Sequence, residues 1–84
     1  MREREIDGFI IRATTAPEEL GAPFYEPAFR LKPVGASVWH EHISYAESQD
    51  TISRTQEEAL AIAEHELDEV TGIHWQGDRW GTIP

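Results

Sequence analysis

The chain has 84 residues, of which 39% are hydrophobic and three are Trp, so it holds enough large side chains for one small core and is not an intrinsically disordered chain. It contains no Cys, which excludes disulfides, thiolate metal sites and cysteine nucleophiles. Its formal net charge of -9 argues against direct binding to DNA or RNA, because phosphate recognition needs clustered Lys and Arg.

Two short strands are predicted in the first half of the chain. Residues 6–13 are rich in β-branched and aromatic side chains, and they lead into a loop over residues 14–23 that contains two prolines and a glycine. A second strand is predicted over residues 29–32, where apolar and basic side chains alternate between two prolines. The prolines favour an edge position or a short strand.

Residues 38–48 alternate most cleanly and predict a third strand. On this strand Ile43 and Tyr45 face the core. His40 and His42 lie two residues apart, so they project together from the opposite face.

A helix is predicted from Gln56 to Thr71. Thr55 begins a capping box that ends at Glu58, and Gly72 stands where a left-handed C-cap glycine belongs. On a helical wheel the apolar side chains form one stripe that docks on the sheet: Ala59, Leu60, Ala63, Leu67 and Val70.

The last residues, 73–84, predict a hairpin or a flexible tail. As a hairpin, Gly77 and Asp78 form a two-residue turn, and Trp75 faces Trp80 across the strands. As a tail, one Trp packs under the helix and the rest of the segment frays.

Together these elements predict a single α+β domain over residues 1–84. A small antiparallel sheet of three strands carries one amphipathic helix across one face, in the order β-β-β-α, followed by the possible C-terminal hairpin. No apolar run approaches the roughly 20 residues that span a bilayer, and residues 1–5 lack the apolar core of a secretory signal. We therefore expect a cytoplasmic protein with no membrane partner.

Most of the charge lies between Glu41 and Glu69. This segment contains nine acidic residues and one base, Arg54, which is a net -8 of the chain's -9. The outward side of the predicted helix carries no Lys or Arg, and its acidic residues are the candidates for binding a basic protein surface: Glu57, Glu58, Glu64, Asp68 and Glu69.

Helix stability alone does not favour this arrangement of charge. Glu64 and Asp68 repel each other four residues apart, and anions in the last turn oppose the helix dipole, for a combined penalty of about 1 kcal/mol. Local rules are broken in this way where function requires it. The alternative is a solvated surface that Arg12, Arg30 or Lys32 of the sheet partly compensates.

Two histidines, His40 and His42, are weak candidates for metal ligands because they share a strand face. His65 or His74 could supply a third position, yet no zinc-binding spacing is present, so no metal is favoured. The serines lack a nucleophile elbow, and the glycines form no phosphate-binding loop. We therefore expect no enzymatic activity and no cofactor.

The pattern as a whole predicts a small acidic, non-enzymatic protein-binding module that inhibits or modulates its partner. The partner is a basic protein surface, including one that ordinarily holds nucleic acid. In size and charge the chain resembles small acidic inhibitors encoded by phages and mobile elements, nucleic-acid mimics among them, without sharing a motif with them. The alternatives are a metal-binding or metal-responsive protein that uses His40 and His42, and an accessory domain that self-associates through Trp75 and Trp80.

Overall fold

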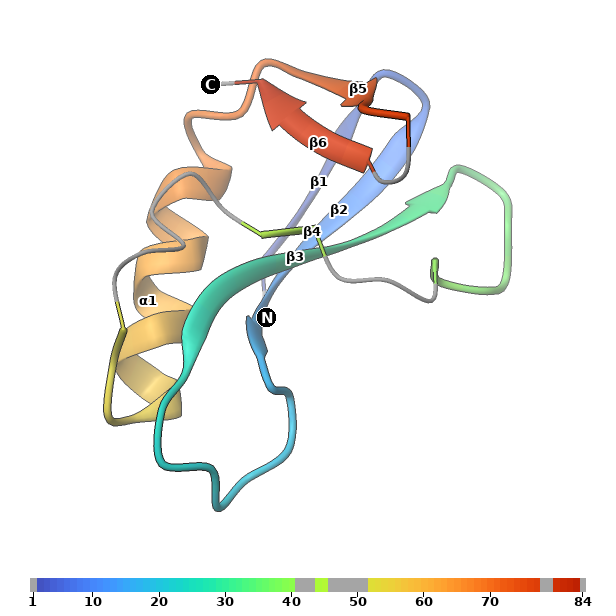
Figure 1. Cartoon of the computed structure of the whole chain (residues 1–84). Coiled ribbons are helices and arrows are strands. Elements are labelled where there is room, and N and C mark those ends of the chain that lie inside the picture. The colour runs from blue at the N-terminus through green and yellow to red at the C-terminus, as the bar shows by residue number, and fades with distance from the viewer. Residues whose placement is uncertain (1, 41–43, 46–51, 78–79, 84) are drawn as a thin grey trace.

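A computed structural model of the chain describes residues 2–40, 44–45, 52–77 and 80–83 (Figure 1). The elements follow in the order β1 (Glu3–Ile6), β2 (Phe9–Ala16), β3 (Glu26–Pro33), β4 (Ser44–Tyr45), α1 (Gln56–Leu67), β5 (Gly72–Trp75) and β6 (Trp80–Ile83). Strands β1 to β4 form an antiparallel sheet in chain order, and β5 pairs with β6 in a separate hairpin. Helix α1 packs across one face of the sheet, which confirms the predicted α+β architecture (Figure 1).

The first predicted strand is in fact a hairpin. Strand β1 pairs with the first half of β2, and the turn between them is Asp7-Gly8. Both turn residues have positive φ, 52° and 81°, as a type I′ turn requires, and Asp-Gly is a preferred pair for that turn. The prediction of one strand over residues 6–13 therefore missed β1, and it also ended too early, because β2 continues through Ala16 into the predicted loop.

Strand β3 is longer than predicted and contains both of its flanking prolines. A proline is tolerated in a strand where its missing N–H would not pair. The backbone N–H and C=O groups of the odd-numbered residues of β3 point away from β2, as the hydrogen bond from the His40 N–H to the Leu31 carbonyl shows. On that edge the described strand β4 pairs with Ala28 and Phe29, so among the described residues Pro27 and Pro33 interrupt no ladder bond.

The third predicted strand is only partly present. Ser44 and Tyr45 form β4, but residues 38–40 are not in strand conformation, so that part of the prediction is wrong. The reason is tertiary: the Trp39 ring lies against basic side chains of β2 and β3, and the His40 ring lies beside Phe9 and Trp80. The predicted positions of Ile43 and His42 fall outside the described residues.

The helix begins as predicted and ends early. The Thr55 hydroxyl accepts a hydrogen bond from the Glu58 N–H at 3.2 Å, so the predicted N-cap is confirmed. The helix ends at Leu67, not at Thr71, and Gly72 begins β5 instead of serving as a C-cap. Arg4 of β1 donates to the carbonyls of Leu67 and Val70, which satisfies helix-end acceptors from outside the helix.

The core lies between α1 and the inner face of the sheet. From the helix it takes Ala59, Ala63 and Leu67, all with no exposed surface. From the sheet it takes the alternating residues of β2 and β3 that share one face, Ile11, Ala13, Phe29 and Leu31. Within the described residues, no helix has the length and apolar character needed to cross a membrane.

The C-terminal hairpin of β5 and β6 contacts the turn between β1 and β2. Trp75 pairs with Trp80 across the strands, as predicted, with ring centroids 5.1 Å apart and an interplanar angle of 65°. The Asp7 carboxylate accepts a hydrogen bond from the Ile73 N–H at 3.0 Å. The flexible tail is therefore excluded for residues 72–77 and 80–83, while the predicted turn at Gly77-Asp78 reaches beyond the described residues.

Candidate functional site

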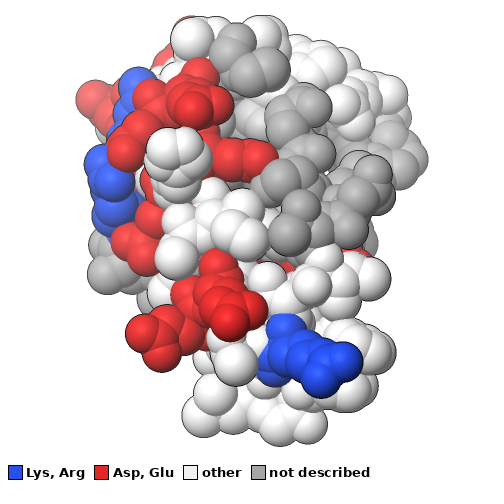
Figure 2. Space-filling model, turned by 90° about the vertical axis from the view of Figure 1, so that its left-hand side faces the viewer, with Lys and Arg blue, Asp and Glu red and all other residues white. Residues whose placement is uncertain are grey.

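The outer side of α1 carries most of the predicted site, and the structure divides it into two parts. Figure 2 looks onto the side of the molecule where α1 lies, and Asp and Glu side chains gather there. Glu57 and Glu58 are exposed in the first turn, where the helix dipole favours negative charge, and Glu64 is half-buried one to two turns later.

At the C-terminal end of the predicted site, Asp68 has a cationic partner. Both terminal nitrogens of the Arg2 guanidinium donate hydrogen bonds to the Asp68 carboxylate, and the bond from Nη1 to Oδ2 is 2.8 Å long. Glu69 lies beyond the end of α1, and one of its carboxylate oxygens is 3.5 Å from Nε2 of His65, a contact that offsets its charge only with a protonated imidazole. The five predicted residues therefore differ, because an arginine offsets the charge of Asp68.

The N-terminal part keeps its charge. Among the described residues, Glu57, Glu58 and Glu64 make no ion pair with a Lys, Arg or His within 4.0 Å. We call these three residues the helix acidic face. It is the remaining uncompensated part of the predicted docking surface.

The predicted compensation from the sheet does not reach this surface. Arg12 and Arg30 are register partners, so their side chains leave the sheet on the same side. The neighbouring pair, Ile11 and Leu31, is buried under α1, which places Arg12 and Arg30 on the open face, away from the helix. Each has an acidic partner there: Arg12 bonds Glu3 and Arg30 bonds Glu18.

The pair of Glu18 and Arg30 is the most firmly held ion pair on the open face. Arg30 Nη2 lies 2.6 Å from Glu18 Oε1, and the Thr14 hydroxyl donates to Oε2 at 2.8 Å. The hydrogen bond from Arg30 lowers the pKa of Glu18, partial burial opposes this, and the bond from Thr14 adds to the lowering. The same bond to Glu18 raises the pKa of Arg30.

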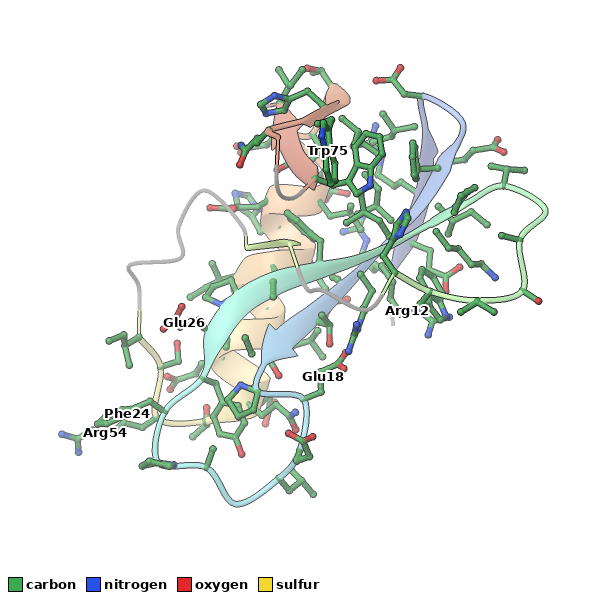
Figure 3. The ribbon with its side chains drawn as sticks, turned by 45° about the vertical axis from the view of Figure 1, so that its right-hand side comes forward. Arg12, Glu18, Phe24, Glu26, Arg54 and Trp75 are labelled. Atoms are coloured by element: carbon green, nitrogen blue, oxygen red, sulfur yellow. The ribbon has the colours of Figure 1, made fainter. Side chains whose placement is uncertain are left out.

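A pocket of about 870 Å³ opens beside this pair. Its lining combines charge, hydroxyl and amide groups with apolar surface, and consists of Arg12, Thr14, Thr15, Glu18, Arg30, Val38, Trp39, His40, Gln56 and Leu60. Figure 3 shows Arg12 and Glu18 close together below the β1–β2 hairpin, well apart from Trp75. No motif in the sequence indicates this pocket, although the alternation of residues 29–32 places Arg30 and Lys32 on one face of the strand.

Trp39 forms the aromatic wall of the pocket. The guanidinium carbon of Arg12 lies 4.3 Å from the centroid of its ring, and Lys32 Nζ lies 4.9 Å from it. Both distances fall within the range of cation–π contacts. The pocket is therefore bordered by a tryptophan that two cations hold in place.

His40 does not belong to a cluster of metal ligands among the described residues. No group of three or more His, Asp or Glu side chains suited to a metal occurs within residues 2–40, 44–45, 52–77 and 80–83, and His42 lies outside these ranges. The Nε2 atom of His40 is buried and has no hydrogen-bond partner in the described part of the chain. Its ring instead packs in an aromatic group with Phe9 and Trp80.

The two predicted aromatic contact residues differ in exposure. Trp80 is partly buried and packs against the core, with its ring centroid 4.8 Å from that of Phe9. Trp75, which shares a face of the hairpin with Trp80, is 55% exposed. Of these two residues, Trp75 is therefore the more accessible to solvent.

No protein-family model, curated protein or solved structure matches this chain.

Proposed function

We propose that the protein is a non-enzymatic protein-binding module that docks its helix acidic face on a basic surface of a partner protein, and so inhibits or modulates that partner. One observation carries the proposal: Glu57, Glu58 and Glu64 have no cationic partner among the described residues, while Arg12 and Arg30 are paired on the far side of the sheet.

The physical basis is electrostatic complementarity. A surface of one sign steers an oppositely charged partner toward it and raises the rate of encounter, with a strong dependence on salt. The helix holds the three carboxylates on a rigid element, so little conformational freedom is lost on docking. A protein groove that ordinarily holds nucleic acid is lined by Lys and Arg and matches such a surface.

The experiment compares two double variants of equal charge change. Glu57→Gln/Glu64→Gln alters the helix acidic face, and Glu5→Gln/Glu19→Gln removes two exposed carboxylates elsewhere. Partners captured from a lysate by the unaltered protein are purified, and their Kd is measured at low and high salt with and without duplex DNA as competitor. We expect the helix variant to weaken binding at least tenfold and the control variant to change it less than threefold. Equal effects of the two variants, or binding that ignores salt, would refute the proposal.

A second candidate function is self-association through the C-terminal hairpin. It is favoured by the exposure of Trp75 at 55%, because a partly exposed tryptophan on β5 is a side chain typical of interface contacts. Sedimentation equilibrium of the protein and of Trp75→Gln tests it. A monomer at all concentrations excludes this candidate.

A further inference from the structure

We propose that the pocket on the open face of the sheet is a binding site for a small organic anion, with Lys32 and Arg12 holding its charged group and Trp39 contacting its apolar body. The ligand class is an aromatic or aliphatic molecule with one phosphate or carboxylate group. The proposal does not depend on the proposed docking function, because none of the three residues of the helix acidic face lines the pocket, although Gln56 and Leu60 of the same helix do.

The charge state of the pocket favours an anion. Glu18 is the carboxylate in its lining, and Arg30 and Thr14 already hold both of its oxygens, so it does not repel a ligand as an unpaired carboxylate would. Lys32, by contrast, makes no ion pair or hydrogen bond in the part of the chain that the structure describes, and its ammonium rests on the Trp39 ring. Lys32 does not itself line the pocket, but its ammonium lies on the ring of Trp39, which does. A positive charge without an acidic partner among the described residues therefore stands next to the pocket.

Arg12 supplies a second set of donors. Its Nε and Nη2 contact the Glu3 carboxylate at 2.7 and 2.5 Å, and its Nη1 has no partner among the described residues. Arg12 and Lys32 leave the same face of the sheet, because Lys32 is two residues from Arg30, the register partner of Arg12, and both cations lie within 5 Å of the Trp39 ring centroid. We therefore place one anionic group beside Trp39 within reach of both side chains. A guanidinium and an ammonium together suit an oxyanion with several acceptor oxygens.

The overall negative charge of the protein does not prevent this. Charges on exposed surfaces are screened over about 8 Å at physiological ionic strength. Among the residues that line the pocket, Glu18 is the acidic one and its carboxylate is already bound by Arg30 and Thr14, while the two lining residues from α1, Gln56 and Leu60, carry no charge. A ligand at Trp39 therefore responds mainly to Lys32, Arg12 and the paired groups near it.

The size and apolar lining of the pocket set the kind of ligand. A volume of about 870 Å³ lies within the range of about 300 to 1,000 Å³ that small-molecule sites occupy. Val38, which is 73% exposed, Trp39 and Leu60 offer apolar surface, whereas inorganic phosphate alone would leave that surface uncovered. An anion with an attached ring or chain uses both parts of the site.

The test follows the indole N–H signal of Trp39 in ¹⁵N-correlated NMR spectra, assigned by its loss in Trp39→Phe. Phenyl phosphate is the probe, and phenol and inorganic phosphate report the separate contributions of the ring and the charge. We expect a saturable shift of the Trp39 signal with phenyl phosphate, and at least tenfold weaker binding of either fragment.

Variants decide whether the named cations hold the anion. Lys32→Gln and Arg12→Gln are each expected to weaken phenyl phosphate at least fivefold. Arg54→Gln, which removes an exposed cation at the far end of the molecule, is expected to change binding less than twofold (Figure 3). Lys32→Gln is the decisive variant because Lys32 makes only the ring contact and its loss does not break an ion pair.

Three outcomes would overturn the proposal: no saturable shift at Trp39, equal binding of phenol and phenyl phosphate, or the same loss of affinity in Lys32→Gln and Arg54→Gln. Glu57→Gln/Glu64→Gln is expected to leave phenyl phosphate binding within twofold. This variant separates failure of the pocket from failure of the docking surface.

Discussion

The outer side of α1 and the open face of the sheet both carry charged side chains, but they hold them differently. On the helix, Glu57 and Glu58 extend into solvent without a cationic partner among the described residues. On the sheet, Arg12 and Arg30 are each fixed by a carboxylate. Unpaired charge acts over distance on a partner, whereas paired charge mainly fixes local geometry. The first region is suited to encounter and the second to shaping a pocket.

The largest expected effect comes from breaking the layer that separates these regions. Phe29 on β3 has no exposed surface and fills the core between sheet and helix. Phe29→Ala is expected to lower the free energy of unfolding by about 3 to 5 kcal/mol, because it leaves a cavity that the core cannot close. Urea unfolding followed by circular dichroism measures this change. A loss below about 1 kcal/mol would mean that the two regions are not held apart by this core.

A smaller gain in stability is expected at His40. Its buried Nε2 lacks a partner among the described residues, and a buried polar atom without a partner costs about 1 to 3 kcal/mol. His40→Phe keeps a ring beside Phe9 and Trp80 and removes that atom. We expect the free energy of unfolding to rise by about 1 kcal/mol, measured by thermal or urea unfolding at neutral pH. Destabilisation would show that the imidazole nitrogen is satisfied in solution.

The ion pair of the open face gives a prediction with a defined pH dependence. Because Arg30 lowers the pKa of Glu18, the folded state binds this proton less readily than the unfolded state. The pair therefore stabilises the fold above the ordinary Glu pKa and loses its effect as pH falls through the lowered pKa. Since Glu18 is partly exposed, Glu18→Gln is expected to cost only about 0.5 to 1 kcal/mol near pH 7.

The measurement for Glu18→Gln is the difference in unfolding free energy from the unaltered protein across pH 2 to 7. The difference is expected to shrink toward zero in acid. Arg12 and Glu3 provide the comparison, because their pair is more exposed than the pair of Arg30 and Glu18, so Glu3→Gln is expected to show a smaller pH dependence. A difference for Glu18→Gln that is constant with pH would contradict the assignment.

The smallest expected effect concerns the difference between the paired Asp68 and the unpaired residues of the helix acidic face. Arg2→Gln releases Asp68 from its guanidinium and extends the uncompensated charge toward the end of the helix. We expect binding of a lysine-rich peptide at low salt to strengthen about two- to threefold, while stability changes by less than about 0.5 kcal/mol because the pair is exposed. Isothermal titration at two salt concentrations measures this, and a weakened interaction would contradict it.

Much of the fold could be predicted from short-range patterns. The Thr55 cap depends on a residue three positions away, and the facing Trp75 and Trp80 depend on one hairpin register. The same kind of signal was present at Asp7-Gly8 and was missed, because the apolar run around it resembles one continuous strand. The acidic residues of the helix could likewise be named in advance, since helical periodicity places them opposite the apolar stripe.

Long-range contacts decided the rest. Trp39 continues an alternating pattern, yet it lies beside Arg12 and Lys32 and not in a strand, because their cationic heads and its ring meet only after β2 and β3 have paired. The pocket has no sequence motif for the same reason. Its lining residues come from both strands, a loop and the helix.

The sequence by itself determined the start of the helix and its acidic outer side, because each arises between residues a few positions apart. It offered the pairing of the two C-terminal tryptophans as one of two alternatives. Only the tertiary structure decided where the helix ends and which of its carboxylates keep their charge free. Arg4 reaches Val70, and Arg2 reaches Asp68, each across a sequence separation of 66 residues. Such contacts form only after the end of α1 has packed beside β1, and no local spacing in the sequence encodes that packing.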